Sequence, residues 1–327
     1  MNHRTLEQIL ADPISQALNP AGKQFMEARV LPSELNPFAK YDVKVVALIP
    51  FATFPHIKTV AAWQMMLEDF EGGLYEGKHT IVVDSSGNTA HAVVRLARAF
   101  GFKKVVTVMS SDVPESKTAI LRAFGDFVDV RHAAKPAEAA REEGEKPGYY
   151  HLNQYGHRGN LRAHELYTGP EIVRTLGGDI SQIAIVSIAM GSAGTVAGVG
   201  RFFKHAHSKT IILGVRPVLG EQVPGARDEK KIKSVVTLPW EESVDHLREV
   251  TRKESFARTR RLWSFIEPQP GPTSGLAWGG LDHLMSGYSS EQLEALSGKY
   301  AAFICPDDGR FYSGPILAEL DPDQGTV

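Results

Sequence analysis

The chain has 327 residues, a formal net charge of −2 at pH 7 and 43% hydrophobic residues, which is enough apolar material for one large or two closely packed α/β domains. The balanced charge gives no reason to expect nucleic acid or a membrane surface as a partner. No apolar run approaches the ~18 residues that span a bilayer, and residues 1–11 lack the pattern of a signal peptide.

Short apolar runs and helix-like patterns alternate along the chain. We predict strands at 45–49, 80–83, 105–109, 127–130, 183–189, 211–215 and 300–305. We predict helices at 6–10, 58–70, 91–100, 114–124, 166–176, 196–203 and 274–285, and a surface helix with a loop within 133–148. Residues 219–261 show no clear pattern. This alternation is typical of parallel sheets that are covered by helices on both faces.

Cys305 ends the last predicted strand, and we expect it to be a core residue. As the single cysteine of the chain it excludes an internal disulfide. It also fits a reducing compartment, so we expect a cytoplasmic protein.

The first loop of interest is Ser85-Ser86-Gly87-Asn88-Thr89, here called the carboxylate loop, which lies between the strand at 80–83 and the helix at 91–100. Unpaired backbone N–H groups and the positive end of the helix dipole meet at such a turn. With the hydroxyl and amide side chains they form a small cup for an anion such as a carboxylate. The alternative interpretation is an ordinary N-cap followed by its helix.

A second loop of the same kind is Gly191-Ser192-Ala193-Gly194-Thr195, here called the phosphate loop. Glycine and small residues let several backbone N–H groups approach one point, which can hold a phosphate without a lysine. The loop lacks the Gly-Lys-Ser/Thr of nucleotide-binding loops and the dinucleotide fingerprint, and a packing loop is the alternative. Two such cups suggest one ligand with a phosphate and a carboxylate, or two ligands side by side.

The order of motifs resembles that of the fold-type II pyridoxal-phosphate (PLP) enzymes, and among them the cysteine synthase and cystathionine β-synthase family. The motifs are the carboxylate loop, Gln154-Tyr155 with Asn160, Thr168-Gly169-Pro170-Glu171-Ile172, the phosphate loop, Gly271-Pro272-Thr273-Ser274-Gly275, and Pro306-Asp307-Asp308-Gly309-Arg310-Phe311-Tyr312. The resemblance covers about residues 45 to 313. It implies an α/β fold of two open, twisted, mostly parallel sheets flanked by helices, as in the tryptophan synthase β subunit.

The resemblance also implies a role for each matching residue. Lys58 would form the imine with PLP. The cofactor would further be held by Asn88 at its phenolic oxygen, by Gly191, Ser192, Ala193, Gly194 and Thr195 at its phosphate, and by Thr273 at its ring nitrogen. The substrate carboxylate would be bound by Ser85, Ser86, Gly87, Thr89 and Gln154. No metal is expected.

The reaction implied is β-elimination or β-replacement on a serine-type amino acid (serine, O-acetylserine or O-phosphoserine) through an aminoacrylate intermediate, as in cysteine synthase. It could belong to general or to specialised amino-acid metabolism. A neutral hydroxyl at the ring nitrogen suits such β-elimination. Two alternatives stay open: a serine or threonine deaminase, and a non-catalytic relative that binds an amino acid or a partner as a sensor.

The resemblance further implies a homodimer in which each chain has two subdomains with the site between them. We expect a smaller, mobile subdomain at 45–160, carrying Lys58 and the carboxylate loop, and a larger one at 1–44 plus 161–327, carrying the phosphate loop.

Several residues depart from the family pattern. The stretch 52–57 reads Ala-Thr-Phe-Pro-His-Ile where the family usually has Asn-Pro-Gly-Gly-Ser-Val, so we expect the side of the pocket that selects the substrate to differ. Lys58 could then be a surface residue of a chain that has lost its cofactor. His56 would be a pocket acid/base or a spacer facing solvent, and His91 a residue of a helix face. Arg227 would pair a second acid group of the substrate or be a solvated charge.

Overall fold

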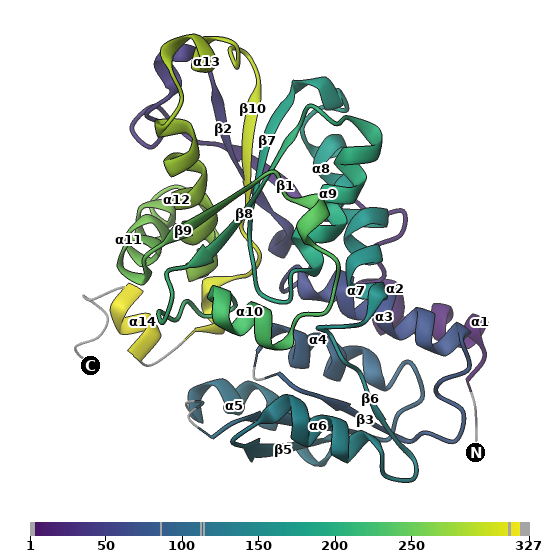
Figure 1. The fold of residues 1–327 in the computed structure, drawn as a ribbon. Coiled ribbons are helices and arrows are strands. Elements are labelled where there is room, and N and C mark those ends of the chain that lie inside the picture. The colour runs from purple at the N-terminus through teal and green to yellow at the C-terminus, as the bar shows by residue number, and fades with distance from the viewer. Residues whose placement is uncertain (1–3, 86, 112, 114, 313–314, 321–327) are drawn as a thin grey trace. The chain divides into compact units, whose positions relative to one another are not determined.

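The computed structural model describes residues 4–320 except 86, 112, 114, 313 and 314. The chain forms two compact units (Figure 1). The first unit comprises residues 1–23 and 58–163, and the second comprises residues 24–57 and 164–327. No helix among the described residues is long and apolar enough to cross a membrane.

The first unit is built on one parallel sheet. Its strands are β3 (Thr80–Val83), β4 (Lys104–Ser110), β5 (Val128–Ala133) and β6 (Tyr149–His151), in the spatial order β5-β4-β3-β6. Its helices are α1 (Leu6–Ala11), α2 (Pro13–Leu18), α3 (Lys58–Glu71), α4 (Asn88–Ala97), α5 (Glu115–Arg122), α6 (Pro136–Gly144) and α7 (Arg158–Ala163). All four residues of β3 are buried. This burial explains why β3 reads as a continuous apolar run instead of an alternating one.

The second unit is built on a larger sheet. Its strands are β1 (Glu27–Val30), β2 (Lys44–Ile49), β7 (Ile183–Ala189), β8 (Ile211–Pro217), β9 (His246–Val250) and β10 (Tyr300–Ile304), in the order β1-β2-β10-β7-β8-β9. Only the pairing of β1 with β2 is antiparallel among these described strands. Its helices are α8 (Gly169–Thr175), α9 (Gly194–Ala206), α10 (Glu229–Val235), α11 (Arg252–Trp263), α12 (Pro272–Ser286), α13 (Ser290–Glu294) and α14 (Pro315–Leu320).

Helices cover both faces of the larger sheet. Figure 1 shows α11 and α12 on one side of β7 and β8, and α8 and α9 on the other. The central strand β7 is accordingly buried at every residue except its last, Ala189. The predicted fold class, two mostly parallel sheets flanked by helices, is confirmed.

The expected subdomain boundaries need two corrections. The strand at 45–49 was expected in the smaller subdomain, but β2 lies in the larger sheet because it pairs in parallel with β10 from Lys44↔Tyr300 to Leu48↔Ile304. Residues 1–23 likewise group with the smaller sheet, since α2 packs against α3 and α4. Both assignments depend on partners far away in sequence, which local patterns do not reveal.

Three helices begin earlier than predicted. Helix α4 begins at Asn88, α9 at Gly194 and α12 at Pro272, so the loop residues form the first helical turns. At helix starts, small and polar residues interrupt the helical spacing of apolar residues. A prediction from that spacing therefore misses these first turns. The first backbone N–H groups of α4 and α9 therefore belong to the two loops themselves.

Candidate functional site

The segment that precedes Lys58 is fixed within the second unit. Ile57 donates its backbone N–H to the Pro306 carbonyl oxygen over 2.8 Å, and His56 forms a β-bridge with Asp307. His56 is fully buried, with its ring centroid 5.6 Å from that of Phe311, so the interpretation of His56 as a spacer facing solvent is wrong. Lys58 follows as the first residue of α3, half-buried, at the point where the chain passes into the first unit.

The carboxylate loop lies at the amino end of α4 in the first unit. Gly87 occupies the N-cap position, and glycine has no side chain that could cap the helix. The Ser85 hydroxyl accepts a hydrogen bond from the Gly87 backbone N–H over 3.3 Å, which closes the turn. Ser86 lies outside the described residues. The helix dipole and its first N–H groups favour an anion here.

The structure brings Thr89 and Gln154 together. The Thr89 hydroxyl donates to Gln154 Oε1 over 2.7 Å, and both residues are buried. Gln154 in turn donates to the Asp84 carbonyl oxygen over 3.4 Å, and its own carbonyl oxygen accepts from Asn160 Nδ2 over 2.7 Å. Gln154 thus holds Thr89 and the end of β3 in place. Direct binding of a carboxylate by Gln154 stays a prediction.

The phosphate loop lies at the amino end of α9 in the second unit. Ala193 adopts a left-handed conformation with φ of 62°, which costs about 1–2 kcal/mol for a residue other than glycine. A left-handed residue followed by a right-handed helix turns successive N–H groups toward one point, which suits an anion. The N-cap residue of α9, Ala193, has no polar side chain that could bond to the first turn of the helix.

A second segment approaches the phosphate loop closely. Arg227 donates its backbone N–H to the Met190 carbonyl oxygen over 2.9 Å, which places residues 224–227 beside the loop. A Cβ atom at Gly191 would lie 2.5 Å from the Gly225 carbonyl oxygen, so only glycine fits at position 191. Of this segment, only Arg227 was assigned a possible role from the sequence. The structure makes Gly225 part of the loop's immediate surroundings.

Thr273 carries a buried hydroxyl in the first turn of α12. Thr273 is 2% exposed, and its Oγ1 has no hydrogen-bond partner among the residues that the structure describes. A Cβ atom at Gly225 would lie 3.4 Å from Thr273 Cγ2. The second unit therefore groups Gly191, Gly225 and Thr273. A buried hydroxyl without a partner is costly, which indicates that a ligand atom completes this site.

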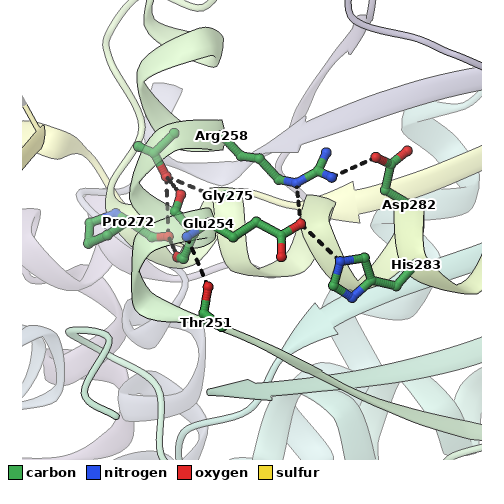
Figure 2. Close-up of polar contacts among 9 residues, drawn as sticks. Thr251, Glu254, Arg258, Pro272, Gly275, Asp282 and His283 are labelled. Atoms are coloured by element: carbon green, nitrogen blue, oxygen red, sulfur yellow. Dashed lines mark hydrogen bonds and ion pairs between the residues drawn. The ribbon is translucent and has the colours of Figure 1, made fainter. Parts of the chain in front are cut away.

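Helix α11 is bonded to the first turn of α12 at Pro272 and Gly275 (Figure 2). The Ser255 hydroxyl donates to the Pro272 carbonyl oxygen over 2.7 Å, and the Thr259 hydroxyl accepts the Gly275 backbone N–H over 3.1 Å. Further along, Arg258 joins Glu254 on α11 to Asp282 on α12 over 2.8 and 2.7 Å. These bonds hold α12 against α11, so the position of the Thr273 hydroxyl does not depend on the first turn alone.

Asp307 and Tyr312 are functional candidates to which sequence analysis gave no role. The Tyr312 hydroxyl donates to Asp307 Oδ2 over 2.5 Å. Burial, and then the charge of Asp307, raise the pKa of Tyr312 well above its usual value, so the phenol stays protonated. A Cβ atom at Gly271 would collide with Asp307 Oδ1. The Pro306–Tyr312 motif was the signal in the sequence. It predicts a turn, but it does not predict the hydrogen bond between Asp307 and Tyr312.

Cys305 follows β10 and is fully buried, which confirms the prediction that it is a core residue. Burial raises the pKa of its thiol to about 12. The thiol is therefore unreactive at neutral pH.

His91 lies in α4, half-buried, with its ring centroid 6.0 Å from that of Phe124. Burial, and then the charge of Arg95, lower the pKa of His91 from 6.5 to about 4. Between these values the unfolded chain binds a proton that the folded chain does not. The free energy of unfolding should therefore hold its full value above pH 6.5 and fall by about 2 kcal/mol as the pH drops toward 4, after allowance for solvent screening.

The substitution His91→Gln should remove this part of the pH dependence, because glutamine does not titrate. Urea denaturation at several pH values from 4 to 7 measures the effect. His205→Gln is the matched control, since the His205 side chain is 70% exposed. An unchanged slope in the His91 variant would contradict the assignment.

Comparisons with known proteins agree with this geometry. Residues 57–295 match the family described as pyridoxal-phosphate dependent enzyme. The chain is similar to cysteine synthase B of Pseudomonas aeruginosa, with 29% identity over 191 residues, which are 54% of this chain and 62% of that relative. The chain thus spans less than two thirds of the relative's length.

Two solved structures share the fold. One is O-ureido-L-serine synthase, with a TM-score of 0.78 and 20% identity, covering 95% of this chain and 96% of the other. The second is an O-acetylserine dependent cystathionine β-synthase from Helicobacter pylori, with a TM-score of 0.74 and 22% identity, covering 92% of this chain and 97% of the other.

Proposed function

This chain belongs to the family of pyridoxal-phosphate dependent enzymes, and on that premise we propose that it catalyses β-replacement on a serine-type amino acid. The amino acid carries a leaving group on Cβ, as in serine, O-acetylserine or O-phosphoserine, and a nucleophile such as sulfide, a thiol or an amine takes its place. The likeness to a cysteine synthase and to two enzymes named for serine derivatives supports this class of substrate.

The observation that carries the proposal is the fit of the second unit to the cofactor. The first N–H groups of α9 suit the phosphate dianion, and Gly191 leaves the space that a side chain would fill. The partnerless Thr273 hydroxyl suits the ring nitrogen as a neutral donor. A neutral donor leaves that nitrogen largely unprotonated, which favours elimination of a β-substituent.

The remaining residues have distinct roles in the proposed reaction. PLP, when bound, withdraws electrons from the substrate so that the Cα proton and the Cβ leaving group can depart. Lys58 Nζ would attach the cofactor in the resting enzyme and take up the Cα proton once the substrate amine has replaced it. Asn88 would donate to the phenolic oxygen. The N–H groups and hydroxyls of the carboxylate loop would orient the substrate carboxylate.

A substrate series tests the proposal. The holoprotein is incubated with serine, O-acetylserine and O-phosphoserine, with and without sulfide or a thiol, and the products are identified by mass spectrometry. A β-substituted amino acid that forms only with a nucleophile supports β-replacement. Pyruvate formed equally fast without a nucleophile would favour the deaminase, and bound PLP without turnover of any amino acid would favour the sensor.

Thr273→Val should have opposite effects on the two forms of the protein. Valine has nearly the shape of threonine but lacks the hydroxyl. The apoprotein should gain about 1 kcal/mol in free energy of unfolding, because a buried polar atom without a partner is removed. PLP affinity should instead fall about tenfold. Thermal unfolding without cofactor and titration with PLP measure the two effects, and a destabilised apoprotein would count against the assignment.

We also propose a homodimer in the cytoplasm. The resemblance supports the dimer, and the single buried cysteine fits a reducing compartment. Analytical ultracentrifugation of the holoprotein measures the oligomeric state.

A further inference from the structure

A buried histidine connects to the phosphate loop. His164 is fully buried and begins the π-helical turn His164–Thr168 in the second unit. Its Nε2 lies 3.1 Å from Thr195 Oγ1, and its Nδ1 lies 2.9 Å from Thr168 Oγ1. Thr195 is the last residue of the phosphate loop and the second residue of α9. One imidazole therefore joins the phosphate loop to the turn that precedes α8.

The tautomer of His164 decides which hydroxyl donates and which accepts, and both tautomers fit the two distances. A neutral imidazole donates from one nitrogen and accepts at the other. If the Thr195 hydroxyl donated to Nε2, its single hydrogen would be used and it could not donate to an anion. With the hydrogen on Nε2, Thr195 accepts from His164 and its own hydrogen stays available. Thr168 then donates to Nδ1, so this tautomer bonds both ring nitrogens and is the one that leaves the Thr195 hydrogen available to an anion.

We propose that His164 is a positioning residue, which directs the hydroxyl hydrogen of Thr195 toward the phosphate of the cofactor. This inference rests on the proposed binding of PLP at the phosphate loop. The imidazole acts through Thr195 and does not itself touch the ligand in this assignment. The location agrees with the role, because single π-helical turns often occur at functional sites. A fully buried histidine also needs both nitrogens bonded, which these partners provide.

Two substitutions separate this role from a structural one. In His164→Gln the side-chain amide extends to the place of Nε2 and can still donate to Thr195. In His164→Asn the shorter amide reaches the place of Nδ1, so it keeps Thr168 but loses Thr195. We expect the Asn variant to bind PLP about tenfold more weakly than the wild type, and the Gln variant to restore most of that affinity. A merely structural role predicts equal losses, or a smaller loss in the Asn variant.

His207 offers a matched control. It lies at the carboxyl end of α9, and its Nδ1 is 3.0 Å from Thr210 Oγ1, so it repeats the histidine–threonine pair away from the phosphate loop. His207→Asn and His207→Gln should leave PLP affinity unchanged. In a Thr195→Val background the two His164 variants should no longer differ, because the hydroxyl through which His164 acts is gone. A remaining difference in that background would overturn the proposal.

The wild-type protein provides a test that does not depend on how the variants fold. Nitrogen-15 NMR of the apoprotein imidazoles should show His164 protonated at Nε2 and accepting at Nδ1, and the opposite tautomer would overturn the inference. The outcomes also separate this inference from the proposed function. Wild-type protein that fails to bind PLP would overturn the proposed function, and with it the phosphate as the target of Thr195. If the wild type binds PLP and the His164→Asn and His164→Gln variants have equal PLP affinities, only the role of His164 is overturned.

Discussion

Lys58→Ala should lower turnover by about 10²–10⁴-fold or more, because the group that moves the Cα proton is removed. The visible absorbance of lysine-attached PLP should disappear as well. Folding should be unaffected, since alanine at the first position of α3 is a good helix former. Absorbance spectra and a single-turnover assay with the best substrate of the series measure both effects.

Lys44→Ala is the control for Lys58. Lys44 opens β2, and its Nζ lies 5.3 Å from the ring centroid of Tyr300. Its loss should cost at most about 1 kcal/mol of stability and leave absorbance and turnover intact. A Lys58→Ala protein that keeps the visible band would show that another lysine holds the cofactor. The surface-residue interpretation of Lys58 would then be correct.

Gly191→Ala should impair cofactor binding at the phosphate loop. The new Cβ would lie 2.5 Å from the Gly225 carbonyl oxygen, and that backbone is fixed by the bond from Arg227 to Met190. The loop or its neighbour must therefore shift. We expect the free energy of unfolding to fall by about 1–3 kcal/mol and PLP affinity to fall by more than about tenfold. Thermal unfolding and PLP titration measure the two quantities.

Gly287→Ala serves as the control for Gly191→Ala. Gly287 follows α12 with φ of −84°, and a Cβ there would lie 3.4 Å from the Leu284 carbonyl oxygen, which is an ordinary contact. This variant should bind PLP like the wild type. If Gly191→Ala also bound PLP like the wild type, the phosphate loop would have more room than the structure indicates. The assignment of this loop as the phosphate site would then be wrong.

Local patterns predicted the elements whose signal lies within a few neighbouring residues. Strands β3 and β7 have the predicted bounds because they are buried on both faces and read as unbroken apolar runs. The resemblance to fold-type II enzymes is confirmed by the family match over residues 57–295. The motifs were sufficient for this conclusion because all six occur in the order that the family shows.

Elements that depend on distant partners were missed. Strand β9 has mostly exposed residues and no apolar run, and it becomes a strand by pairing with β8. Gly225 and His164 were not identified for the same reason. The importance of Gly225 depends on its contact with Gly191, and that of His164 on its contact with Thr195. One signal for His164 was present: it precedes Thr168 by one helical turn, on the same face as that motif residue.

The order of strands in the larger sheet has a consequence for synthesis on the ribosome. Strand β10 lies between β2 and β7, yet β2 ends at Ile49 and β10 begins at Tyr300. The ribosome adds roughly 5–20 residues per second, so tens of seconds pass between the synthesis of β2 and that of β10. During that time one edge of β2 and one edge of β7 lack their native partner and remain open to other chains. A nascent chain stalled before Tyr300 should therefore need a chaperone to stay soluble, even though residues 58–163 have already been made.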